Sequence, residues 1–217
     1  MDFRFYHDVQ IPAGKIVLEG ELIIPRSAEA IVIFSHGSGS SRFSARNRMV
    51  AASLHEHNFG TLLFDLLTRE EDAVYQNRFD IHLLTERLCD AVKWLVQQPV
   101  AKNCSIGLFG ASTGAASALK AAAKLPSIVE AVVSRGGRPD LAGKDLHAVK
   151  APTLLIVGSH DYEVLQLNEE AYEELTCDKK IETVDGATHL FEEPGKMELV
   201  SVLAAGWFAK YLHGVNV

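Results

Sequence analysis

The feature that most constrains this fold is a regular alternation of short apolar runs with longer helical patterns. Continuous apolar runs such as residues 30–34 are typical of strands buried on both faces of a sheet. Strands are expected at residues 30–34, 60–64, 105–109, 129–134, 153–157 and 180–184, and helices at about 44–58, 78–98, 115–126, 165–175 and 196–212. Strands that alternate with helices form a largely parallel sheet covered on both faces, so the sequence predicts an α/β fold.

The first 25 residues predict a different kind of strand pairing. Residues 6–11 and 16–24 have strand patterns, and the segment between them contains Pro12 and Gly14, which favour a turn. We therefore expect an antiparallel hairpin at one edge, which gives a sheet of about eight strands. The 217 residues contain no repeat or linker, so residues 1–217 are expected to form a single domain. Residues 68–72 are expected to be a polar loop.

Composition excludes several classes of protein. The net charge is −7 and no basic block occurs, which argues against a nucleic-acid partner. The first residues lack the pattern of a signal peptide, and no apolar run approaches the roughly 20 residues of a membrane span. Cys89, Cys104 and Cys177 are odd in number and far apart, so they are expected to be reduced thiols in a cytoplasmic protein. No metal or cofactor is expected.

A glycine-flanked serine lies between an expected strand and an expected helix. The sequence Gly110-Ala111-Ser112-Thr113-Gly114 follows the G-x-S-x-G pattern of a nucleophile elbow. In such an elbow a strained turn presents the serine hydroxyl, and the residues two before and two after it must lack bulk. The competing interpretation is an ordinary strand-to-helix turn whose serine caps the helix.

A serine nucleophile needs a histidine base that is oriented by a carboxylate. Catalytic residues on a parallel sheet lie in the loops after strands, and in this arrangement the order is serine, acid, histidine. Asp161 follows the strand expected at 153–157, and His189 follows the strand expected at 180–184, so we predict them as acid and base. Asp185 and Glu163 are alternative acids.

The loop after the strand at 30–34 reads Ser35-His36-Gly37-Ser38-Gly39. Its glycines allow it to fold over the nucleophile, so the backbone N–H groups of Ser38 and Thr113 are predicted to bind the oxyanion of an acyl-transfer reaction. The competing interpretation is a phosphate-binding glycine loop. This loop lacks the lysine and the glycine spacing that the usual nucleotide-binding motifs contain.

These motifs together resemble the α/β-hydrolase superfamily, and within it the dienelactone-hydrolase-like group, over nearly the whole chain. The resemblance implies an α/β-hydrolase fold, and residues 134–152 are too few for the cap domain that many members carry. The dienelactone hydrolases for which the group is named use a cysteine nucleophile, whereas this chain has Ser112. The resemblance therefore implies a serine carboxylesterase rather than ring-opening of dienelactone.

Arginines are frequent in the expected post-strand loops and the helix starts after them, at positions 42, 46, 48, 69, 135 and 138. Arg42 or Arg135 is a candidate for binding an anionic part of a small ester substrate. The alternative is that these arginines pair with acidic neighbours such as Glu70, Glu71, Asp72 and Asp140.

Three functions follow from this site. The first is hydrolysis of small carboxylic esters. The second uses the same site for acyl transfer, or for hydrolysis of a lactone or phosphotriester. The third is a catalytically silent accessory module on a hydrolase scaffold. A monomer and a homodimer are both compatible with the sequence.

Overall fold

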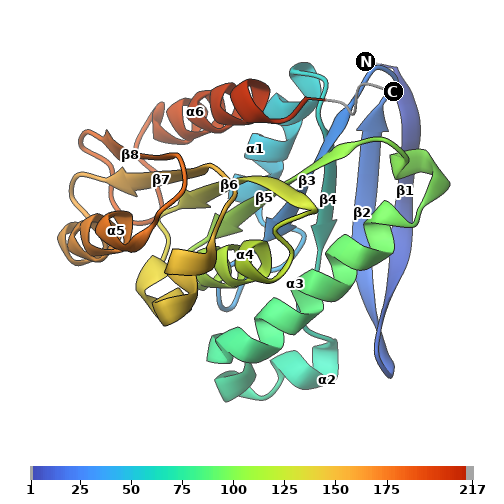
Figure 1. Ribbon diagram of the computed structural model, residues 1–217, viewed down its shortest axis with the longest axis horizontal. Helices are drawn as coiled ribbons and strands as arrows, with labels where there is room; N and C mark the ends of the chain where they lie inside the picture. The colour runs from blue at the N-terminus through green and yellow to red at the C-terminus, as the bar shows by residue number, and fades with distance from the viewer. Residues whose placement is uncertain (1, 214–217) are drawn as a thin grey trace.

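Within residues 2–213, which the computed structural model describes, eight strands form one sheet in the order β1-β2-β4-β3-β5-β6-β7-β8 (Figure 1). The strands are β1 (Phe3–Ala13), β2 (Ile16–Pro25), β3 (Ala30–Ser35), β4 (Gly60–Phe64), β5 (Ser105–Ala111), β6 (Val129–Arg135), β7 (Thr153–Gly158) and β8 (Lys179–Val184). The hairpin β1–β2 and the β2–β4 pair are antiparallel, and every other pairing is parallel. The predicted α/β sheet with an N-terminal hairpin is confirmed.

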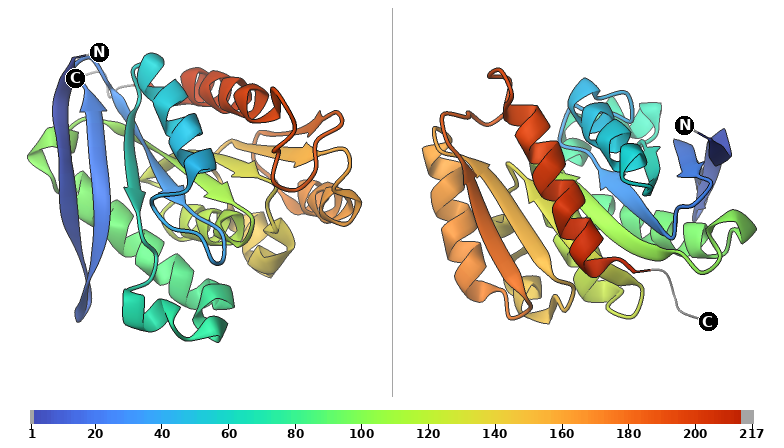
Figure 2. Two further views of the ribbon diagram at one scale, coloured as in Figure 1. Left: turned by 180° about the vertical axis from the view of Figure 1, so that it is seen from behind. Right: turned by 90° about the horizontal axis from the view of Figure 1, so that it is seen from above.

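Helices cover both faces of the sheet (Figures 1 and 2). One face carries α1 (Ala45–Glu56) and α6 (Lys196–Tyr211), and the other carries α3 (Ile81–Val96), α4 (Thr113–Lys124) and α5 (Tyr162–Glu174). Each face has its own apolar core. Leu54 of α1 and Phe208 of α6 pack on the first face, and Leu88 of α3 and Leu119 of α4 pack on the second. All four side chains are fully buried.

The segment after β4 differs from the prediction. Residues 68–72 do not form a loop but a short helix, α2 (Arg69–Asp72), that begins with a capping box. The Thr68 hydroxyl accepts from the N–H of Glu71, while the Glu71 carboxylate accepts from the N–H of Thr68. The next expected helix is also shorter than predicted. It begins at Ile81 because Asp80 caps it, and the 3-10 turn η1 (Tyr75–Phe79) precedes it.

No cap domain lies over the carboxyl ends of the strands in residues 2–213. The segment between β6 and β7 contains only the 3-10 segment η3 (Pro139–Ala148), and the 3-10 turn η2 (Pro99–Ala101) follows α3. Within the same residues, no helix combines the length and the apolar character needed to cross a membrane. The carboxyl ends of β3, β5, β6, β7 and β8 therefore meet at one edge without a covering domain.

Candidate active site

Ser112 occupies a strained turn between β5 and α4. Its φ of 52° and ψ of −123° lie in a region that favours glycine. A Cβ added at Gly110 would lie 2.4 Å from Ala115 Cα, and one added at Gly114 would lie 2.1 Å from the Ser35 carbonyl oxygen. The two glycines are therefore required by close packing, as the motif predicts. The Ser112 side chain makes no capping hydrogen bond to α4, so the helix-capping interpretation is wrong.

The loop after β3 lies directly over Ser112. A Cβ added at Gly37 would lie 3.1 Å from Ser112 Cβ and 3.8 Å from its Oγ. The next residue supplies the predicted oxyanion donor, and the Ser38 N–H donates to Thr113 Oγ1 at 2.9 Å. The Thr113 N–H lies at the start of α4, where backbone N–H groups have no partner within the helix. Both predicted donors therefore lie beside the serine, and a side-chain hydroxyl already accepts from one of them.

His36 holds this loop in place, a role that the sequence reasoning did not assign. The Leu66 N–H donates to its Nε2 at 3.1 Å, so its Nδ1 carries the proton and donates to the Gly37 carbonyl at 3.0 Å. That carbonyl belongs to the same peptide group as the Ser38 N–H. By fixing the carbonyl, His36 fixes the direction of the opposite N–H. Burial lowers the pKa of His36, which favours this neutral form.

His189 and Asp161 meet through their side chains. The Nδ1 of His189 donates to Asp161 Oδ2 at 2.7 Å. Asp161 directly precedes α5, and its side chain is 14% exposed against 37% for His189. The alternative acid Asp185 instead accepts from the Ser159 hydroxyl at 3.4 Å. Of the carboxylates weighed from the sequence, Asp161 is the one that bonds to His189.

Hydrogen bonds within the loop that carries His189 join Thr188 to Glu193. The Thr188 N–H and hydroxyl both donate to Glu193 Oε1, at 3.2 and 2.6 Å. The same loop also contacts the segment beside the serine, because a Cβ added at Gly136 would lie 3.6 Å from His189 Nδ1. These contacts fix the position of the imidazole relative to the sheet edge.

Residues 135–136 contact both Ser112 and His189. The Ser112 N–H donates to the Arg135 carbonyl at 3.2 Å, and Gly136 contacts His189. Within the described residues, no hydrogen bond joins the Ser112 hydroxyl to the imidazole. Catalytic hydrogen bonds are often absent without substrate and form when it binds. Since Nδ1 of His189 is bonded to Asp161, Nε2 is the nitrogen left for the hydroxyl.

Most of the arginines singled out from the sequence have acidic partners, but these are mostly not the ones expected. Arg42 pairs with Asp65 and with Glu19, the latter at 2.7 Å. Arg138 pairs with Asp140 as predicted. Arg48 pairs with Glu21 and Arg46 with Glu192, whereas Asp72 and Glu71 are bound by Arg78 and Arg87. Arg42 is thus held by two carboxylates, and we do not assign it to substrate. Arg135 has a different environment, which is described below.

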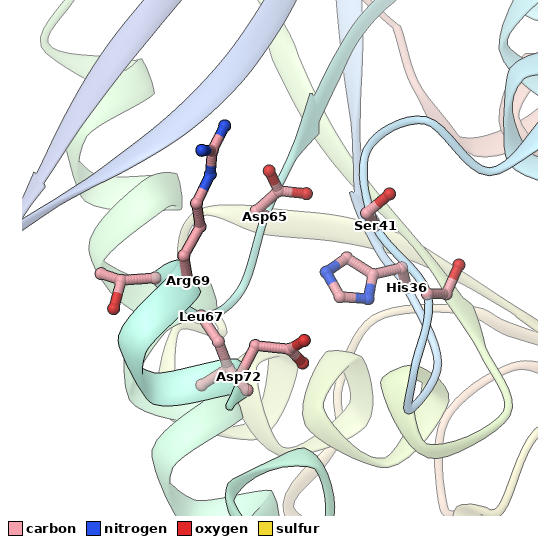
Figure 3. A pocket seen from close by; sticks show the side chains of 8 residues that line it. His36, Ser41, Asp65, Leu67, Arg69 and Asp72 are labelled. Atoms are coloured by element: carbon pink, nitrogen blue, oxygen red, sulfur yellow. The ribbon is translucent and has the colours of Figure 1, made fainter. Parts of the chain in front are cut away.

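A pocket of about 150 Å³ opens beside the oxyanion loop. Figure 3 shows the His36 ring on one side of it and Asp65, Arg69 and Asp72 on the other. The pocket walls thus come from the loop after β3 and from the segment around α2. Within residues 2–213, no group of three or more His, Cys, Asp or Glu side chains is arranged to hold a metal ion.

Comparison with known proteins identifies the family and the fold. Residues 18–206 match the Dienelactone hydrolase family. The chain is similar to the dienelactone hydrolase of Anabaena variabilis, whose crystal structure superposes with a TM-score of 0.94 at 50% identity, covering 96% of this chain and 99% of that one. An esterase of Pyrococcus furiosus shares the fold at 19% identity, with a TM-score of 0.81 over 96% of this chain and 92% of its own.

Two relatives from Mycobacterium tuberculosis, both named "Putative phosphoribosyl transferase", are 53% identical over 207 residues. The match covers 95% of this chain and 47% of theirs, so this chain spans about half the length of these relatives. The family match covers most of the chain, and the fold agrees with it. The protein is a hydrolase-fold chain that belongs to the dienelactone hydrolase family.

Proposed function

We propose that this protein is a serine hydrolase that cleaves small carboxylic esters through Ser112, His189 and Asp161. The observation that carries the proposal is a strained, uncapped serine beside residues 135–136, which also contact a histidine that is bonded to a carboxylate. A serine that only shaped the turn would have no need of a φ of 52°, which costs a residue with a side chain about 1–3 kcal/mol. Strain of this size persists where function requires it.

The first step of the proposed mechanism is attack on the ester carbonyl. His189 Nε2 takes the proton of the Ser112 hydroxyl as Oγ bonds to the carbonyl carbon, and Asp161 stabilises the imidazolium that forms. The carbonyl oxygen becomes an oxyanion that accepts from the N–H groups of Ser38 and Thr113. Proton transfer requires a hydrogen bond between the Ser112 hydroxyl and His189 Nε2, and we propose that it forms when the substrate binds.

The second step releases the acyl group. The protonated His189 gives its proton to the departing alcohol, and a water molecule then attacks the acyl-serine with His189 again as the base. Because no cap domain covers the sheet edge within residues 2–213, this edge is accessible to water and to another acceptor. The nature of the acceptor thus separates hydrolysis from acyl transfer, and we propose water.

The names of the longer relatives point to transfer of a phosphoribosyl group. We do not propose that activity for this chain, because its elbow and its His189–Asp161 pair favour acyl transfer instead. Lactones and phosphotriesters are alternative substrates of the same serine, and the assays below include them.

The decisive experiment is labelling with a fluorophosphonate probe, followed by assays on p-nitrophenyl acetate. We expect Ser112 to be labelled, and Ser112→Ala to abolish labelling and to lower the rate by about 10³-fold or more while the protein stays folded. Activity that survives Ser112→Ala would overturn the mechanism. An intact protein that neither reacts with the probe nor cleaves esters, lactones or phosphotriesters is the silent module instead.

A further inference from the structure

Arg135 is a buried arginine that has no acidic partner among residues 2–213. It is the last residue of β6 and is 6% exposed. Its Nη2 donates weakly to Asn47 Oδ1 at 3.4 Å, and its Nε is buried without a hydrogen-bond partner. Burial, and then repulsion by the charge of Arg46, lower the pKa of Arg135 to about 10. A buried cation without a counter-ion destabilises the folded protein, so its presence calls for a functional explanation.

A second arginine, Arg46, lies near enough to Arg135 to repel its charge. Arg46 lies in the first turn of α1, and its Nε is also buried without a partner. One of its terminal nitrogens, Nη1, donates to Glu192 Oε1 at 2.8 Å, but the Glu192 side chain is 63% exposed. Glu192 therefore pairs with Arg46 alone, and it is the one carboxylate that bonds to either guanidinium group within residues 2–213. The local charge is net positive.

The start of α1 adds to this positive potential. The helix has 12 residues and no acidic residue in its first turn. Ser44 caps it by accepting from the N–H of Asn47, so the amide groups that precede Asn47 remain oriented outward at the positive end of the helix dipole. A helix start alone would not define a site. Here it coincides with two arginine Nε groups that lack acceptors.

The arginine pair lies close to the proposed nucleophile and base. The carbonyl of Arg135 accepts from the Ser112 N–H, and its guanidinium carbon lies 5.9 Å from the centre of the Phe191 ring. Phe191 is two residues after His189 and contacts the position of a Cβ on Gly136 at 3.3 Å. Arg135 is thus connected to both Ser112 and the His189 loop by direct contacts.

We propose that Arg135 and Arg46 form an anion-binding site that receives a second, negatively charged group of the ester substrate. The oxyanion of a carboxylate or a phosphate would accept from the unpartnered guanidinium N–H groups and replace the missing counter-ion. This inference deepens the proposed function by naming the substrate class, an ester with an anionic substituent. The substrate class rests on the proposed ester hydrolysis, whereas binding of the anion does not and can be measured separately.

Kinetics on three matched acetate esters tests the substrate class. They are 4-acetoxybenzamide, 4-acetoxybenzoate and 4-acetoxyphenyl phosphate, which differ in the charge of one substituent. We expect kcat/KM to favour one anionic ester over the amide, and this preference to fall by about tenfold or more in Arg135→Met and in Arg46→Met. The anionic ester that is preferred shows whether a carboxylate or a phosphate is the natural group.

Arg48→Met is the matched control, because Arg48 lies in the same helix but pairs with Glu21. It should leave the preference unchanged. If Arg135→Met lowers kcat/KM equally for all three esters, or leaves the preference intact, the site does not bind substrate and the proposal is wrong. If Arg135→Met fails to fold, the same comparison on Arg46→Met decides.

Calorimetry with benzoate and with phenyl phosphate separates this proposal from the proposed function. Even if the wild-type protein hydrolyses none of the esters, binding of either anion that is lost in Arg46→Met and in Arg135→Met supports the site. Absence of binding by both anions overturns it. Thermal unfolding supplies a further readout: a purely structural arginine predicts a lower melting temperature for Arg135→Met, whereas an uncompensated one predicts an equal or higher value.

Discussion

The strained backbone at Ser112 predicts that removal of its side chain has opposite effects on stability and on activity. Both Ser112→Ala and Ser112→Gly delete the proposed nucleophile, so both variants should lose activity. They differ in the backbone, because alanine keeps a Cβ at φ 52° and ψ −123°, while glycine occupies this region without the same penalty. We therefore expect the inactive glycine variant to be the more stable of the two.

The size of the difference follows from two opposing terms. Relief of the strained conformation is worth about 1–3 kcal/mol. Glycine loses more conformational freedom on folding, which costs about 0.5–1 kcal/mol relative to alanine. The net advantage of Ser112→Gly over Ser112→Ala is then about 1 kcal/mol. For a domain of this size, that corresponds to a melting temperature higher by about 2–4 °C.

Thermal unfolding of the two variants, followed by circular dichroism, measures this difference. The matched control is the pair Ser127→Ala and Ser127→Gly, because Ser127 is exposed and is not among the residues with positive φ. There the glycine variant should be the less stable one. If Ser112→Gly melts at or below Ser112→Ala while the Ser127 pair behaves as expected, the turn does not store strain and the reasoning fails.

Three further predictions follow from the site and the core. His36→Leu removes the side-chain hydrogen bond to the Gly37 carbonyl and leaves only that from the Ser40 N–H, so kcat should fall by about 10- to 100-fold with KM little changed. A fall confined to KM would contradict the positioning role of His36. Asp161→Asn should lower kcat by about 10³-fold or more, whereas Asp185→Asn should stay within a few-fold of the wild type in the same ester assay. Burial lowers the pKa of His55 from 6.5 to about 4, so protonation favours the unfolded state and stability is lost as pH falls from 6.5 through 4. Urea unfolding at several pH values should therefore show a flatter acid limb for His55→Gln, and an unchanged limb would contradict this assignment.

The sheet and the positions of Ser112, Asp161 and His189 could be predicted because they depend on local patterns. Apolar runs define the strands, and the parallel arrangement brings the loops after β5, β7 and β8 to one edge. The boundaries around α2 depended on finer signals. The capping box at Thr68 and Glu71 was present in the sequence, but it was too short a pattern to outweigh the polar composition of that segment.

The arginine partners could not be predicted in the same way. Arg42 binds Glu19 of β2 and Asp65 after β4, which are distant in the sequence and adjacent only because the two strands pair. The role of His36 likewise depends on the Leu66 N–H from the neighbouring strand's loop. The lack of an acidic partner for Arg135 likewise depends on tertiary structure, because folding determines which carboxylates lie near its guanidinium group.

The hydrogen bond from the Ser38 N–H to the Thr113 hydroxyl has a consequence for how the proposed site distinguishes substrate from transition state. A substrate carbonyl that approaches this donor exchanges one neutral acceptor for another and gains little binding free energy. The charged oxygen that forms during attack is a much stronger acceptor and can displace the hydroxyl with a net gain. The Thr113 side chain thus competes with the ground state but hardly with the oxyanion, so the binding free energy of this donor is realised mainly in the transition state.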